Sequence, residues 1–196
     1  MTAEERRSPL AAFADRFDAA AKSGNLRLTD LPFRTQLNLR VDTGGGVAAG
    51  LEAALGVPLP AEPNTVSATT AGSGDLTVTW LGPDEWLVLG PPDLAQEPLH
   101  RAVQEAAGDQ HVSLVDVSAQ RTTLLVAGPR ARDLLAHGCG LDLHPSVFGP
   151  GRCAQTMLAR AQVVLVAQPD GFHVLVRASF AAYLAEWLLD AATEYL

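Results

Sequence analysis

The sequence has few basic residues, and this scarcity limits the partners that the protein can bind. Its 196 residues contain 14 Lys and Arg against 22 Asp and Glu, so the formal net charge is −8. Affinity for the phosphate backbone of nucleic acid depends on clustered Lys and Arg. Here these residues are scattered among the acids, which argues against nucleic acid and against anionic membrane surfaces as partners.

Cysteines and long apolar runs are also scarce. Two cysteines in a chain of this length do not make a disulfide framework, and they favour free thiols in a reducing compartment. Residues 1–17 carry six charged side chains between Glu4 and Arg16, which leaves no apolar segment of a secretory signal. The apolar stretch at 161–169 has the length of a strand, not of a membrane-spanning helix. We therefore expect a cytoplasmic protein without a membrane span.

What the sequence does contain is one order of elements that occurs twice after an N-terminal helix. That helix is predicted over 8–24, with Ser8 as its N-cap. Its predicted apolar face comprises Leu10, Phe13, Ala14 and Phe17. The first copy is predicted to have a strand at 33–41, a helix at 44–56, a proline-bearing connection at 57–64, a hairpin at 76–90 and a further helix at 92–107. The second copy is predicted to have the same elements in the same order, at 122–128, 129–138, 139–151, 162–177 and 179–196. The last helix is predicted to bury Phe180, Tyr183, Leu184, Trp187 and Leu188.

Fixed spacing between the two sets supports a duplication. The turn Pro83-Asp84 and the turn Pro169-Asp170 lie 86 residues apart, and so do WLVLG and FHVLV, which follow them. We therefore predict an α+β fold, a duplicated strand-helix-hairpin-helix module with antiparallel sheets, whose pseudo-repeats cover about 31–110 and 111–196.

Both cysteines and two histidines lie in HGCGLDLHPSVFGPGRC at 137–153. As a zinc site this segment would read H-x-C-x₄-H-x₈-C, which lacks the paired ligand spacing of such sites. A nucleophilic thiol would need a base and a positive charge, which His144 and Arg152 supply only if the fold brings them to it. The corresponding connection of the first copy has neither Cys nor His. The favoured interpretation is structural: Cys139 and Cys153 are small buried residues, and His144 caps a turn.

No other motif assembles a catalytic, cofactor-binding or metal-binding site. The glycine-rich DTGGGVAAG at 42–50 lacks the Lys-Ser/Thr pair of a phosphate loop, so it is interpreted as a turn into a helix. Asp84 and Glu85 belong to a hairpin turn, and Asp116 is expected to be held by Ser118 or Arg121.

Six stretches are distinctive: SPL at 8–10, PFRTQLNLR at 32–40, LGPDEWL at 81–87, DVSAQRT at 116–122, GPRARDLLAHGCGLDLHPSVFGPGRCAQTMLARAQVVL at 128–165 and LVRASFAAYLAEWLLDA at 175–191. Together they resemble the gamma subunit of heterotetrameric sarcosine oxidase. The resemblance covers nearly the whole chain, as one domain over 1–196. It implies an aminomethyltransferase-like fold, related to the glycine cleavage T-protein.

The same resemblance implies a role without catalytic residues. The chain would be an accessory subunit of an oxidoreductase acting on CH-NH donors, which demethylates sarcosine to glycine with hydrogen peroxide and formaldehyde or methylene-tetrahydrofolate. Its partners would be the alpha, beta and delta subunits. The complex would use FAD, FMN, NAD and tetrahydrofolate, with no cofactor bound by this chain.

Two other functions remain open at this point. One is a stand-alone folate-binding aminomethyltransferase-like protein, although such enzymes need further domains to enclose the pterin. The other is a free-standing small-molecule binding module, for which the sequence has no pocket signature. For the accessory subunit, Arg and Trp are the residue types that anchor permanent interfaces. Since the second half is rich in arginine, we expect Arg152 and Arg160 to contribute to docking on the flavin-bearing subunits.

Overall fold

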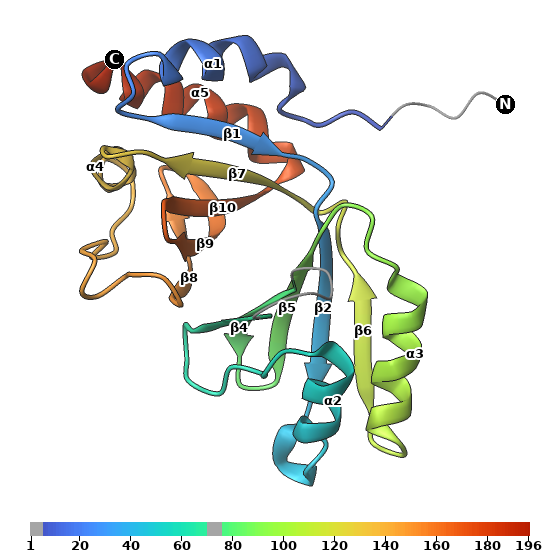
Figure 1. The fold of residues 1–196 in the computed structure, drawn as a ribbon. Helices are drawn as coiled ribbons and strands as arrows, with labels where there is room; N and C mark the ends of the chain where they lie inside the picture. Colours follow the sequence, from blue (N-terminus) through green and yellow to red (C-terminus); the bar gives the residue numbers. More distant parts are fainter. Residues whose placement is uncertain (1–5, 70–75) are drawn as a thin grey trace, which may run out of the picture. The chain divides into compact units, whose positions relative to one another are not determined.

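The computed structural model describes residues 6–69 and 76–196, so Glu4 and Glu5 of the charged N-terminus lie outside the described residues (Figure 1). Contacts within the chain divide it into two units. The central unit comprises Arg34–Ser118 and Gly151–Ala154. The terminal unit comprises Met1–Phe33, Ala119–Pro150 and Gln155–Leu196, so both ends of the chain belong to it.

The central unit is built on a five-stranded antiparallel sheet with the order β3-β4-β5-β2-β6. Its elements are β2 (Thr35–Val41), α2 (Ala48–Leu55), β3 (Val66–Ala68), β4 (Thr77–Gly82), β5 (Glu85–Gly90), α3 (Gln96–Ala107) and β6 (Val112–Asp116). Leu37 and Leu39 alternate along β2 and are fully buried against Val103 of α3 and their other core neighbours. Trp86 is also a core residue, and its indole N–H donates to the Pro60 carbonyl at 2.9 Å.

The terminal unit has a second five-stranded sheet, with the order β1-β7-β10-β9-β8. Its elements are α1 (Ala14–Ala21), β1 (Arg27–Leu31), β7 (Arg121–Ala127), α4 (Ala131–Ala136), β8 (Cys153–Leu158), β9 (Ala161–Gln168), β10 (Gly171–Arg177) and α5 (Ala181–Ala192). The first two residues of β8 are grouped with the central unit. Strand β9 has an uninterrupted apolar run, and Val163–Ala167 are all buried, as expected for a strand covered on both faces. Helices α1 and α5 run side by side (Figure 1). The exposed Arg16–Glu186 ion pair, at 2.7 Å, joins them.

The two sheets have the same strand order when β2, β3, β4 and β5 are matched with β7, β8, β9 and β10. The remaining edge strands, β6 and β1, then occupy equivalent positions. β1 comes directly before β2 in the chain, but it pairs with β7 of the other sheet. β6 comes directly before β7, but it pairs with β2. The units therefore have other boundaries than the expected pseudo-repeats 31–110 and 111–196. The duplication stays a proposal, which the shared strand order supports.

Two predicted helices differ in phase or extent from the structure. The N-terminal helix begins as a 3-10 turn, η1 (Ala11–Phe13), and Ser8 accepts a hydrogen bond from the Leu10 amide before the helix starts. Ala14, expected on the apolar face, is exposed. In the last helix Phe180 and Tyr183 are 43% and 38% exposed, because Phe180 belongs to a preceding 3-10 turn, η3 (Ala178–Phe180), which shifts the apolar stripe. The buried residues of α5 are Ala181, Leu184, Ala185, Leu188 and Ala192.

In the part of the chain that the structure describes, none of the helices has the length and apolar character needed to traverse a bilayer.

Candidate functional site

The segment 137–153 is shaped by close packing at its beginning. A Cβ atom on Gly138 would lie 2.7 Å from the Trp187 ring and 2.9 Å from the Ala159 amide nitrogen, so only glycine fits without a shift. The next residue, Cys139, is buried and forms an isolated β-bridge with Leu158. This part of the segment follows from backbone packing and does not depend on thiol chemistry.

Arg132 of α4 holds the middle of the same segment. Its guanidinium donates hydrogen bonds to the carbonyls of Leu143 and, at 3.0 Å, of Phe148. It also lies over the ring of Phe172, 4.9 Å from the ring centroid, and Phe148 stacks on that ring. The planar guanidinium has several N–H donors, so it can lie over the ring and donate to both carbonyls at the same time. Arg132, one of the arginines of the arginine-rich second half, therefore has its partners inside the terminal unit.

The two cysteines of the segment belong to different units, Cys139 to the terminal unit and Cys153 to the central unit. The Cys153 thiol is buried and donates to the carbonyls of Thr65 at 3.4 Å and Trp80 at 3.6 Å. Burial raises the pKa of Cys153 to about 11, despite the opposing effects of the Trp80 hydrogen bond and the Arg152 charge. Because the thiolate is the nucleophile, Cys153 is unreactive at neutral pH.

His144 caps a turn, as predicted. Its ring Nδ1 lies 2.7 Å from the Ser146 hydroxyl, and its carbonyl accepts hydrogen bonds from the amides of Val147 and Phe148. Within the described ranges, no group of three or more His, Cys, Asp or Glu residues is placed to hold a metal ion.

The acids and glycines considered from the sequence have local partners. Asp116 accepts hydrogen bonds from the Ser118 hydroxyl and amide, which lower its pKa, so the predicted Ser118 contact is confirmed. Asp84 faces Arg40 at 3.4 Å across exposed surface. At the glycine-rich turn, the amide of Gly44 donates to the Asp42 carboxylate. In a phosphate loop such an amide would donate to a phosphate, so here a carboxylate of the chain takes the place of that phosphate.

Arg152 and Arg160, expected to contribute to docking, lie in different units. Arg152 donates to Glu62 at 2.8 Å, and 43% of its side chain stays exposed. Arg160 lies in the two-residue turn between β8 and β9, where its amide donates to the Tyr183 hydroxyl at 3.3 Å. Among residues 6–69 and 76–196 its exposed guanidinium has no hydrogen-bond or ion-pair partner. Arg160 is therefore the more available of the two.

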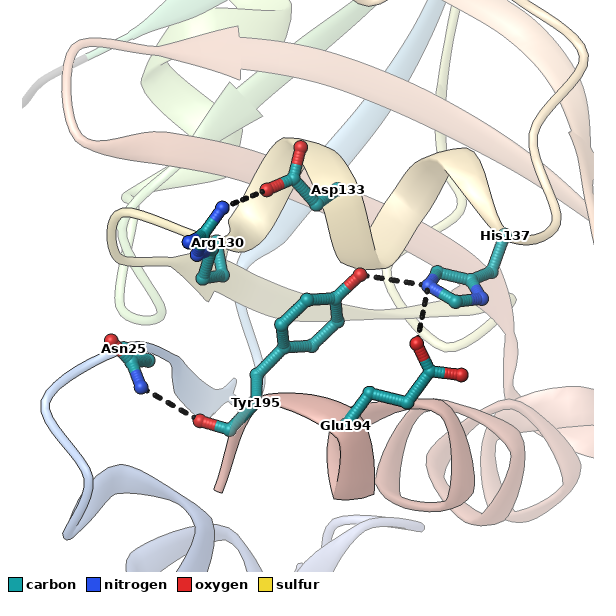
Figure 2. Close-up of polar contacts among 6 residues, drawn as sticks. All are labelled: Asn25, Arg130, Asp133, His137, Glu194 and Tyr195. Atoms are coloured by element: carbon teal, nitrogen blue, oxygen red, sulfur yellow. Dashed lines mark hydrogen bonds and ion pairs between the residues drawn. The ribbon is translucent and has the colours of Figure 1, made fainter.

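The C-terminal turn makes a polar cluster that the sequence did not indicate (Figure 2). The ring of His137, at the end of α4, lies 2.8 Å from the Tyr195 hydroxyl and 3.8 Å from the Glu194 carboxylate. Asn25 donates to the Tyr195 carbonyl at 2.8 Å. Lost hydration, together with the nearby Glu194 charge, raises the pKa of Tyr195. The cluster fixes the C-terminus, and only the folded chain brings these distant residues together.

The terminal unit also has a hollow of about 510 Å³ on its sheet. Strands β7, β8, β9 and β10 all contribute to it. It is lined by Arg121, Gln155, Thr156, Met157, Gln162, Val163, Val164 and Arg177. Arg121 and Arg177 are direct cross-strand partners, and none of the described residues that line the hollow is acidic. From the sequence, Arg121 is a candidate partner of Asp116, and nothing there indicates that Arg121 faces Arg177.

Comparison with known proteins relates this chain to one family. The model of the sarcosine oxidase, gamma subunit family matches residues 41–194. Sarcosine oxidase subunit gamma of Corynebacterium sp. strain U-96 is 38% identical over 193 residues, which cover 97% of this chain and 91% of the relative. The same subunit of Corynebacterium sp. strain P-1 is 35% identical with the same coverage.

Solved structures agree with this relation. A chain of the heterotetrameric sarcosine oxidase from Corynebacterium sp. U-96, in complex with pyrrole 2-carboxylate, matches with a TM-score of 0.85 and 38% identity, covering 97% of this chain and 96% of that chain. Aminomethyltransferase T of the glycine cleavage system from Bartonella henselae matches with a TM-score of 0.63 and 18% identity over 92% of this chain and 49% of that one, which shows the fold alone. The predicted aminomethyltransferase-like α+β fold is thereby confirmed, and this chain belongs to the sarcosine oxidase gamma subunit family.

Proposed function

We propose that this chain is a non-catalytic accessory subunit of a heterotetrameric sarcosine oxidase. The complex would demethylate sarcosine oxidatively to glycine, with hydrogen peroxide and formaldehyde or methylene-tetrahydrofolate as the other products. The observation that carries the proposal is the likeness, over nearly the full length of both chains, to a chain of a heterotetrameric sarcosine oxidase. The buried Cys153 thiol and the locally paired acids are consistent with a chain that supplies no catalytic group.

The proposed partners are the alpha, beta and delta subunits, in the cytoplasm. FAD, FMN, NAD and tetrahydrofolate would be bound by the complex and not by this chain. Support comes from the turn at Asp42, where the Gly44 amide is already bound by a carboxylate of the chain. A dinucleotide phosphate would have to compete with this negative charge.

The alternative, a stand-alone folate-binding aminomethyltransferase, has weaker support. The likeness to aminomethyltransferase T covers only 49% of that protein. The rest of that enzyme has no counterpart in this chain, whereas the gamma subunits are matched over 91% of their length.

Co-purification tests the proposed function. A tagged version of this chain, co-expressed with the other subunits from its native host, is expected to purify as one complex with sarcosine-dependent hydrogen peroxide production and flavin absorbance. The same chain expressed alone is expected to be colourless. A stoichiometric flavin on the isolated chain, or aminomethyltransferase activity of the isolated chain, would contradict the proposal.

We further propose that Arg152 and Arg160 contribute to docking on the flavin-bearing subunits. Reversing both charges, Arg152→Glu with Arg160→Glu, is expected to weaken assembly of the co-expressed complex on a sizing column. Arg160→Glu alone should account for most of the loss, because Arg152 already binds Glu62. Arg101→Glu is the matched control, since Arg101 is an exposed arginine of α3. If the double variant assembles like the control, docking lies elsewhere.

A further inference from the structure

The hollow on the terminal sheet concentrates positive charge on an acidic protein. Among the described residues that line it, two are arginines and none is acidic, although the whole chain has a net charge of −8. Arg121 and Arg177 stand directly opposite each other on β7 and β10, where like charges destabilise a sheet. Within the described part of the chain, the Arg177 guanidinium has no hydrogen-bond or ion-pair partner. The arrangement suits an anion that binds the Arg177 guanidinium beside the second positive charge of Arg121.

The other side chains that line the hollow can bind a carboxylate and an apolar side chain next to it. Gln155 and Gln162 add amide donors, and Thr156 adds a hydroxyl. Met157 is 44% exposed at the same hollow. Arginine and methionine are enriched in the buried parts of protein interfaces, whereas lysine and acidic residues are depleted there.

The exposure of the lining favours a macromolecular ligand over a small one. Gln155, Met157, Gln162 and Arg177 are all exposed, so the hollow is open along much of its lining. Small-molecule sites bury about 70–90% of their ligand, which an open surface of this kind does not do. A protein segment laid across the strands needs to bury only its carboxylates and one apolar side chain.

We infer that the hollow lined by Arg121, Arg177, Gln155, Gln162 and Met157 is the docking site for an acidic segment of another subunit of the complex. This inference rests on the proposed function and names the chemistry of one contact within it. The Arg177 guanidinium binds a carboxylate of the segment, and Arg121 adds a second positive charge beside it. Met157 packs against an apolar side chain of the segment next to this acid. The pairing also relieves the repulsion between the two arginines.

Charge variants of Arg177 in the co-expressed complex test the inference. Arg177→Glu is expected to raise the dissociation constant of this chain from the complex by tenfold or more, as loss of a charge-assisted hydrogen bond does. Arg177→Lys should have a smaller effect, because an ammonium keeps the charge but not the forked geometry. The wild-type complex should dissociate more readily at high NaCl, and Arg177→Gln should reduce this salt dependence. Arg101→Glu, an exposed reversal on α3, should match the wild type.

Further measurements distinguish loss of docking from misfolding, from a small-anion site and from failure of the proposed function. The isolated Arg177→Gln chain should unfold at the same temperature as the wild type or higher, since a like-charge pair is removed, so weak assembly will not reflect misfolding. Assembly of Arg177→Glu with unchanged affinity would overturn the inference. That outcome, together with thermal stabilisation of the wild-type chain but not of Arg177→Glu by sodium citrate, would identify a small-anion site instead. Failure of the wild-type chain to co-purify with sarcosine oxidase activity would refute the proposed function itself.

Discussion

At the scale of single residues, the Cys153 thiol links burial to pH-dependent stability. Its pKa is raised from 9.0 to about 11 in the folded chain. Above pH 9 the unfolded chain therefore releases this proton while the folded chain keeps it, so stability falls as the pH rises toward 11. Below pH 9 both states hold the proton, and the contribution is complete.

Cys153→Ala is expected to reduce the loss of stability between about pH 9 and pH 11. The free energy of unfolding, measured by denaturant titration at several pH values, should differ between the wild type and the variant by a constant amount up to pH 9. The two curves should then converge. Parallel curves up to pH 11 would show that the buried thiol does not titrate as inferred.

A second residue-scale prediction concerns turnover. The double variant Cys139→Ser, Cys153→Ser is expected to leave the sarcosine turnover of an assembled complex nearly unchanged, because neither thiol is placed for chemistry, although stability can fall. Steady-state hydrogen peroxide production measures this. A loss by orders of magnitude in a correctly assembled complex would restore a catalytic role for a thiol.

At the scale of elements, Arg132 joins α4 to the segment 137–153. Arg132→Ala removes two hydrogen bonds from a charged donor, and we expect it to lower the free energy of unfolding by about 2 kcal/mol. Hydrogen exchange of the amides around Phe148 should become faster. Arg130→Ala, at the N-cap of the same helix, is the matched control: its exposed pair with Asp133 should contribute less than about 1 kcal/mol. Equal losses in the two variants would argue against the proposed role of Arg132.

The sequence predicts the central strands better than the edge strands. β2, β5, β7, β9 and β10 have dense or alternating apolar residues, so their place in the core is visible in the sequence. The edge strands β1, β3 and β8 were not expected, because RLTDL, VSA and CAQTML mix polar and apolar residues and have only partial burial. Their strand character comes from pairing with a neighbouring strand: β1 pairs with the distant β7, whereas β3 and β8 pair with the next strands along the chain, β4 and β9.

At the candidate sites, contacts between residues close in the sequence were predicted, whereas contacts between distant residues were not. The local contacts of Asp116 and His144 were predicted, because their partners lie two to four residues away. The facing pair Arg121 and Arg177 and the contact between His137 and Tyr195 depend on sheet register and on the docking of the last turn. Periodicity along the chain does not contain that information.

At the scale of the whole molecule, the two sheets share no strand, and we expect a core substitution to act mainly on its own sheet. Leu28→Ala in β1, where Leu28 is 3% exposed, is expected to cost about 2–5 kcal/mol and to accelerate hydrogen exchange in β7 and β10. Leu37→Ala in β2 is the matched variant and should act on β5 and β6. Equal acceleration in both sheets by either variant would show that they open as one.

The position of β1 in the chain has a consequence for synthesis. β1 ends at Leu31, but its partner β7 begins at Arg121, so the ribosome adds 89 further residues between them. At about 5–20 residues per second this takes on the order of ten seconds. During that time the N-terminal segment has no strand to pair with, and its buried residues Phe17 and Leu28 have no completed core. Synthesis of Arg121–Ala127 therefore sets the earliest time at which this N-terminal segment can complete its fold, and until then its apolar side chains are open to association with other chains.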